Sequence, residues 1–225
     1  MNASDIMVHD VVTVRPDDDV SHAAQLLVDH DVSALPVVDA NGRVVGILSE
    51  ADLLHREEIG TEKQRPWWLE AITPINTLAV DYAKSHGRKV EEIMSTQVVS
   101  VAEDTPISEI ATVLERKRIK RVPVLKEGKL VGIVSRTNLI QALASATAGT
   151  DEHSRESDRA IRLELLSRLG ARPWSGFGER NVVVDNGIVH LWGLVDSPEQ
   201  RAALRALAED VPGVQSVSDE MIASY

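Results

Sequence analysis

Two short motifs place a serine three residues before a side chain that can accept hydrogen bonds. They are Ser49-Glu50-Ala51-Asp52 and Ser135-Arg136-Thr137-Asn138. Each follows an apolar run, so we expect the serine at a helix N-terminus, where free N–H groups attract an anion. One turn further on, the Asp52 carboxylate can accept hydrogen bonds from two ribose hydroxyls, whereas the weaker acceptor Asn138 favours a phosphate contact. Plain N-capping by both serines is the alternative.

Both motifs lie in an internal repeat. Aligning 6–38 with 93–125, and 42–54 with 128–140, gives 17 identities in 46 positions. Unrelated segments share only a few, so the sequence contains a duplication. At about 50 residues, one copy is too small for a robust core, and we expect the two copies to pack as a pair.

Each copy predicts the element order β-α-β-β-α. In the first copy, Val11–Val14 favours a short strand, and the acids of 17–19 favour a helix start. Strands are expected over 34–38 and 44–48, joined by a turn at Asn41-Gly42. A second helix is expected to begin at Ser49.

This pattern resembles the CBS domain, named after cystathionine β-synthase. The resemblance covers about 4–55 and 92–145 and is carried by Leu35-Pro36-Val37, Val122-Pro123-Val124 and the two serine motifs with their preceding strands. It implies binding of AMP, ADP or ATP, with S-adenosylmethionine a weaker candidate. Backbone beside Pro36 and Pro123 would hold the adenine. The implied nucleotide-binding residues are Thr13, Ala34, Leu35, Pro36, Ser49, Asp52, Ser100, Lys120, Arg121, Val122, Pro123, Ser135, Arg136 and Asn138.

Charge is distributed unevenly along the chain. The 225 residues carry a formal net charge of -11, which argues against nucleic acid as the main partner. The net charge is -8 over 1–91, +2 over 92–150 and -5 over 151–225. The cations of the second repeat cluster over 116–121. Several fixed cations suit a polyphosphate, and a solvated helix face is the alternative.

The segment between the repeats predicts a helix that starts near Pro66 and stops near Gly87. Its Trp67 and Trp68 would fill a gap against the repeat pair or form a dimer or interdomain contact. After the second repeat, small and polar residues indicate a linker. The expected organisation is a first repeat over 1–56, a helical insert over 57–91, a second repeat over 92–147, a linker over 148–156 and a last domain over 157–225.

The last domain predicts the order α-β-β-α-β and resembles the BON domain. The resemblance covers about 155–225 and is carried by 184–195, which includes the hairpin turn Asn186-Gly187, and by 213–217. Family members are often periplasmic, and some are thought to bind phospholipid, but we expect this chain to depart from that group by lacking an export signal.

Strand alternation separates the two faces of the predicted hairpin. Both helices are expected on one side of the sheet, so Val189, Leu191, Gly193 and Val195 would face them and Ile188, His190, Trp192 and Leu194 would lie on the open face. We expect His190, Trp192 and Leu194 to form an interaction surface for the repeat pair or a second subunit. A membrane is disfavoured because the domain has a net charge of -5. The alternative reverses the faces and buries Trp192.

Catalytic motifs are missing from the sequence. There is no cysteine, no His-Glu-x-x-His, no phosphate loop and no nucleophile motif. We therefore expect a non-enzymatic regulatory protein of α/β (α+β) class, without a catalytic or metal site and with no required cofactor. Its repeat pair would bind the nucleotide, form a homodimer and signal through the last domain to a protein target. The alternative is a dimeric scaffold with an empty pair, whose last domain binds phospholipid, a cation or a protein.

Localisation is expected to be cytoplasmic. The first residues carry no signal-peptide pattern, and nowhere do 18 apolar residues run together.

Overall fold

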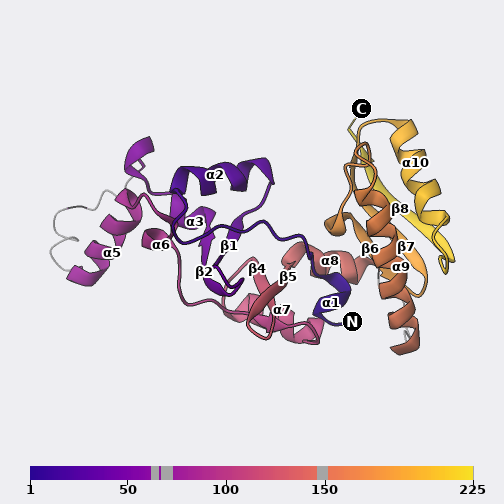
Figure 1. Ribbon diagram of the computed structural model, residues 1–225, viewed down its shortest axis with the longest axis horizontal. Coiled ribbons are helices and arrows are strands. Elements are labelled where there is room, and N and C mark those ends of the chain that lie inside the picture. Colours follow the sequence, from indigo (N-terminus) through magenta and orange to yellow (C-terminus); the bar gives the residue numbers. More distant parts are fainter. Residues whose placement is uncertain (62–65, 67–72, 146–151, 225) are drawn as a thin grey trace. The chain divides into compact units, whose positions relative to one another are not determined.

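The computed structural model describes residues 1–61, 66, 73–145 and 152–224. Helices and strands are interspersed along the chain, which confirms the expected fold class (Figure 1). Trp67 and Trp68, expected at a contact surface, lie outside the described residues.

The element bounds are as follows. The first repeat contains α1 (Ala3–Ile6), α2 (Val20–Asp29), β1 (Ala34–Val38), β2 (Val44–Ser49) and α3 (Glu50–Leu53), and the insert contains η1 (Glu57–Ile59) and α5 (Ile75–His86). The second repeat contains α6 (Val90–Ile93), β3 (Val101–Ala102), α7 (Ile107–Arg116), β4 (Arg121–Lys126), β5 (Lys129–Ser135) and α8 (Arg136–Ser145). The last domain contains α9 (Glu152–Gly170), η2 (Glu179–Asn181), β6 (Val182–Asp185), β7 (Ile188–Val195), α10 (Pro198–Glu209) and β8 (Ser216–Ala223).

The duplication is visible in the backbone. Asp31 and Arg118, 87 positions apart, both have left-handed backbone angles, with φ of 49° and 54°. The glycines of the two hairpin turns, Gly42 and Gly128, have φ of 76° and 79°. The leading strand of each copy is shorter than expected: Val14 makes an isolated parallel bridge, and β3 has two residues.

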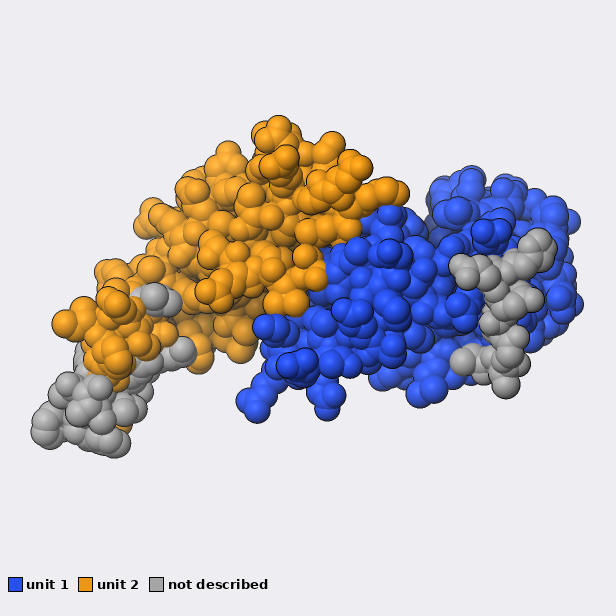
Figure 2. Space-filling view, turned by 90° about the horizontal axis from the view of Figure 1, so that it is seen from below, with its two compact units in different colours: residues 1–10, 101–124, 131–225 blue, residues 11–100, 125–130 orange. Residues whose placement is uncertain are grey.

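The chain forms two compact units, and each combines parts of both copies (Figure 2). In unit 1, which contains 1–10, 101–124 and 131–225, the start of the chain packs with the second repeat. The Ala3 N–H donates to the Thr105 carbonyl at 2.9 Å, and Val8 forms an antiparallel bridge with Ile133. The first helix of the first copy therefore completes the second copy.

The reverse exchange occurs in unit 2, which contains 11–100 and 125–130. The Val90 N–H donates to the Asp18 carbonyl at 3.0 Å, and Ser95 forms an antiparallel bridge with Ile47. Val90 and Ile93 are fully buried in the core of the first repeat. Each copy thus folds with the leading segment of the other.

In the insert, α5 ends at His86, as expected from Gly87. The buried side chain of Arg56 donates to the carbonyls of Lys84 and Gly87, at 2.8 Å each. These bonds satisfy carbonyl groups that the end of a helix leaves without partners.

The last domain confirms the order α-β-β-α-β. Strand β7 pairs antiparallel with β6 and parallel with β8. Asn186 and Gly187 both have positive φ, 52° and 73°, as a type I′ turn requires. Helices α9 and α10 pack on one face of the sheet, where Val189, Leu191 and Val195 are buried, so the predicted faces of β7 are confirmed.

The open face of this sheet is less exposed than expected. Leu194 is 66% exposed, but His190 is only 8% exposed and Trp192 is half-buried. The expectation of an exposed strip was therefore wrong for His190 and Trp192. Parallel pairing with β8 brings the Glu220 carboxylate within 3.0 Å of His190 Nδ1, and α8 packs against β6, whose Val183 on this face is also buried.

Candidate functional site

The first repeat brings its predicted ligand residues to one end of β1 and β2. Ala34 pairs with Ser49 across the two strands. The Val14 N–H donates to the Pro36 carbonyl at 3.1 Å, which places the neighbouring Thr13 beside β1. Leu35 is fully buried and contributes to the core. The structure therefore brings together the members of this set from three separate segments.

Ser49 and Asp52 form a capping box. The backbone N–H and the hydroxyl of Ser49 donate to Asp52 Oδ2, at 3.0 and 2.8 Å. The other carboxylate oxygen, Oδ1, forms an ion pair with Lys84 Nζ. Helix α3 has only four residues and carries Glu50 and Asp52 in its first turn, so its start does not favour an anion. N-capping, the alternative interpretation of Ser49, describes this geometry.

The second repeat has the same capping geometry with a neutral partner. The N–H and the hydroxyl of Ser135 donate to Asn138 Oδ1, at 2.8 and 2.7 Å. Asn138 is buried, with 6% of its surface exposed. Ser100 directly precedes β3, which adjoins β4, the strand that contains the buried Val122 and Pro123. These residues again gather beside one capping motif.

The basic run follows the end of α7. Arg116 lies in the last turn of α7, where a cation is favourable. Lys120 is exposed and Arg121 half-buried, immediately before and at the start of β4. Arg136, expected to bind the ligand, donates from Nε to the Ile119 carbonyl at 3.1 Å, so it also supports the turn between α7 and β4.

Sequence reasoning missed a buried arginine that joins the last domain to the start of the chain. Arg162 on α9 is 5% exposed and donates from Nε to the Val182 carbonyl at 3.1 Å. Its Nη2 donates to the carbonyls of Met7, at 3.1 Å, and Glu179, at 2.9 Å. Burial lowers the pKa of this guanidinium, and the nearby Glu179 and Asp5 charges oppose that shift.

Glu179 holds the same segment from the other side. Its carboxylate accepts hydrogen bonds from the backbone N–H groups of His9 and Asp10 and contacts His9 Nδ1 at 2.8 Å. Burial alone would raise the pKa of Glu179, but these hydrogen bonds outweigh it and hold the pKa below its usual value. The contact of η2 with the chain start thus uses the backbone N–H groups of His9 and Asp10 as well as side chains.

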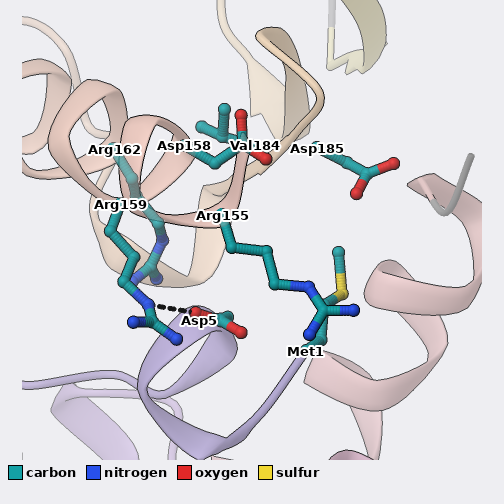
Figure 3. A pocket seen from close by; sticks show the side chains of 8 residues that line it. All are labelled: Met1, Asp5, Arg155, Asp158, Arg159, Arg162, Val184 and Asp185. Carbon is teal, nitrogen blue, oxygen red and sulfur yellow. Dashed lines mark hydrogen bonds and ion pairs between the residues drawn. The ribbon is translucent and has the colours of Figure 1, made fainter. Parts of the chain in front are cut away.

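Three arginines extend from α9 toward α1, as Figure 3 shows: Arg155, Arg159 and Arg162. Arg159 forms an ion pair with Asp5 on α1. Asp158 is buried on the same helix and accepts hydrogen bonds from the N–H groups of the Asn186-Gly187 turn, at 2.8 and 2.7 Å. One sequence signal existed: Asp158 and Arg162 share the helical face of the apolar Ile161, Leu165 and Leu169.

In the part of the chain that the structure describes, no group of three or more His, Cys, Asp or Glu side chains is placed to hold a metal ion. None of the described helices is both long and apolar enough to cross a membrane.

Family models match most of the chain. The CBS domain model matches residues 3–58 and 90–145, and the BON domain model matches 157–224. The curated relatives match the repeat region. CBSX2, a chloroplastic CBS domain-containing protein of Arabidopsis thaliana, is 32% identical over 135 residues, 57% of each chain. The uncharacterized protein MJ1426 of Methanocaldococcus jannaschii is 31% identical over 154 residues, 64% of this chain and 91% of its own.

The fold of the repeats is similar to that of a solved structure. The crystal structure of CBSX2 in complex with AMP superposes with a TM-score of 0.56 at 30% identity, over 64% of this chain and 96% of that one. The chain spans 57% of the length of CBSX2 and 64% of that of its relative CBSX1. With two CBS repeats that complete each other and a BON domain attached through α9, this chain belongs to the CBS-domain proteins and carries a CBS pair followed by a BON domain.

Proposed function

We propose that the CBS pair binds an adenosine nucleotide (AMP, ADP or ATP) and that the BON domain passes the ligand state to a protein target. The observation that carries the proposal is the AMP complex of CBSX2, a structure 30% identical to this chain. In this proposal the repeats over 1–56 and 92–147 form the sensor, and the domain over 157–225 is the output.

In this proposal, the chemistry of the residues at the two nucleotide sites gives each of them a role in binding. Backbone beside Pro36 and Pro123, with the segments at Thr13 and Ser100, holds the adenine. Asp52 and Asn138 accept hydrogen bonds from ribose hydroxyls or lie beside a phosphate. Lys120, Arg121 and Arg136 supply positive charge for the phosphates, in a repeat whose net charge is +2. Ala34, Leu35, Val122, Ser49 and Ser135 shape the two sites.

The route to the BON domain runs through the start of the chain. Val8 bridges to β5 of the second repeat, while Arg162 and Glu179 hold Met7, His9 and Asp10. A ligand that binds two arrangements of the second repeat with different affinity therefore also shifts the contacts of the BON domain.

A second function is favoured by the Asp52–Lys84 ion pair. In this second function, the Asp52 carboxylate is held by Lys84, the first site binds no nucleotide, and the CBS pair serves as a dimeric scaffold. The BON domain then carries the activity, binding phospholipid, a cation or a protein.

Titration calorimetry with AMP, ADP and ATP separates the two functions. Replacing both acceptors, Asp52→Ala with Asn138→Ala, is expected to weaken binding about tenfold or more, because a hydrogen bond to a charged group contributes roughly 1.5–3 kcal/mol. The matched control is Asp29→Ala with Gln25→Ala, which removes one exposed carboxylate and one exposed amide from α2. Its dissociation constant should equal that of the wild type.

The wild type itself provides a further check. Ligand at 100 times its dissociation constant should raise the free energy of unfolding by about 2.7 kcal/mol. A wild type that binds none of the three nucleotides contradicts the sensor function and favours the scaffold. Equal affinities of wild type and double variant contradict the assignment of the two acceptors.

Homodimerisation through the CBS pair is part of the proposal. Helix α8 exposes Ile140 and Leu143, 66% and 77% exposed, on the side opposite its buried Ala142 and Ser145. An exposed apolar stripe of this kind is typical of an interaction surface.

Ile140→Asp with Leu143→Asp is therefore expected to convert a dimer to a monomer in sedimentation velocity experiments. Leu163→Asp, at another exposed apolar position on α9, is the control and should leave the dimer intact. A wild type that sediments as a monomer, or a double variant that remains dimeric, would rule out this interface.

A further inference from the structure

We propose that Lys84 of the insert closes the first-repeat ribose site by occupying Asp52, so that the insert sets the affinity of this site for nucleotides. The inference rests on the proposed nucleotide function and names a regulator of the same site. The carrying observation is the ion pair between Lys84 Nζ and Asp52 Oδ1, which joins α5 to α3.

Both oxygens of the Asp52 carboxylate are already in use. Oδ2 accepts two hydrogen bonds from Ser49, and Oδ1 contacts the Lys84 ammonium group. The side chain of Asp52 is 9% exposed, so little of the carboxylate remains open to a ligand. Ribose hydroxyls that bind Asp52 must therefore displace Lys84.

The position of Lys84 is fixed by the fold of the insert. Arg56, the buried N-cap residue of η1, donates from Nη1 to the Lys84 carbonyl and from Nη2 to the Gly87 carbonyl, at 2.8 Å each. Its guanidinium also pairs with Glu58 on η1. Lys84 is thus anchored through its own backbone carbonyl, while its ammonium group holds Asp52. Asp52 is released only when the bonds of Arg56 change or when the Lys84 side chain moves.

The second repeat has no carboxylate at the equivalent position, so it needs no cationic partner like Lys84 there. Asn138, the equivalent of Asp52, is neutral and already bonded to Ser135. A buried carboxylate needs a compensating partner, whereas a buried amide needs only hydrogen bonds. The two sites are therefore unequal: a ligand that binds Asn138 breaks no ion pair, whereas a ligand that binds Asp52 must displace Lys84.

Thermodynamic linkage makes this coupling reciprocal. A nucleotide that displaces Lys84 loosens α5, and any partner that pulls α5 away strengthens nucleotide binding at the first site by the same factor. The helix of the insert is thus a second output of the sensor.

Calorimetry with AMP on the full chain tests the proposal. Lys84→Met keeps the aliphatic stem and removes the charge, and it should tighten the first site about tenfold or more, seen as an added binding event or a lower dissociation constant. Lys84→Gln, which keeps a neutral donor, should give a smaller gain. The matched control is Lys89→Met, because Lys89 is an exposed cation of the same segment that pairs with Asp19 instead.

Hydrogen exchange adds a readout that does not depend on affinity. AMP should raise amide exchange over residues 75–86 in the wild type, while Lys84→Met should show that raised exchange without ligand. If the wild type binds AMP and Lys84→Met binds it no tighter, the role of Lys84 is overturned and the nucleotide function stands. If neither protein binds AMP, ADP or ATP, both proposals are overturned.

Discussion

Replacing Arg162 with methionine is expected to lower the free energy of unfolding by about 3 kcal/mol or more. The guanidinium donates to three carbonyl oxygens, those of Val182, Met7 and Glu179, within a buried environment. Each buried acceptor that loses its donor costs roughly 1–3 kcal/mol. Methionine retains the apolar stem, so the loss measures the hydrogen bonds rather than the packing.

Urea denaturation of Arg162→Met and of a matched variant checks this result. Arg159→Met removes an arginine from the same helix whose ion pair with Asp5 is partly exposed, so its cost should stay below about 1 kcal/mol. Exchange of the His9 and Asp10 amides, which donate to Glu179, should rise in Arg162→Met. Equal stabilities of the two variants, with unchanged exchange at these amides, would mean that Arg162 does not hold the BON domain to the chain start.

Much of the local structure could be predicted because its causes are local. Asp19 is the N-cap of α2, where the acidic run indicated a helix start. Gly170 ends α9, and Ser197 caps α10 with its side chain accepting from the Gln200 N–H. The Asn186-Gly187 turn needs two residues that tolerate positive φ, and both are adjacent in the sequence. The capping motifs of both repeats were located by the same kind of reasoning.

The exchange of leading segments could not be predicted. Ile6-Met7 and Ile93-Met94 are identical dipeptides, so either could complete either copy by its pattern of apolar residues. Which copy each dipeptide completes depends on the path of the chain between the repeats. The secondary-structure propensities of the residues do not encode that path. The burial of His190 was missed for a related reason, because it depends on the parallel neighbour β8 rather than on alternation within β7.

The ion pair of Asp52 was missed because its partner lies 32 residues away in the insert. Neither periodicity nor the resemblance to the CBS domain bears on that segment. The sequence therefore located the carboxylate but could not show that it is already occupied, and this difference changes the expected affinity of the first site.

Gly132→Ala is expected to destabilise the protein by about 1–3 kcal/mol, more than the equivalent Gly46→Ala. A methyl group on Gly132 would lie 2.6 Å from Met7 Sδ and 3.1 Å from the Val8 carbonyl oxygen. Val8 is fixed by its hydrogen bonds with Ile133, at 3.0 and 2.9 Å, so the backbone cannot move away cheaply. On Gly46 the nearest atoms all belong to the flexible side chain of Met94, which can change rotamer.

Second-site rescue turns this difference into a test of the exchanged segments. Met94→Ala should restore most of the stability lost in Gly46→Ala, whereas Met7→Ala should restore only part of that lost in Gly132→Ala, since the Val8 carbonyl remains. Thermal unfolding of the single and double variants gives the coupling for each pair. If each copy instead kept its own leading segment, Met7 would couple to Gly46 and Met94 to Gly132. With the leading segments exchanged, the losses of stability should simply add in the crossed double variants, Gly46→Ala with Met7→Ala and Gly132→Ala with Met94→Ala. Rescue in either crossed variant would contradict the exchange.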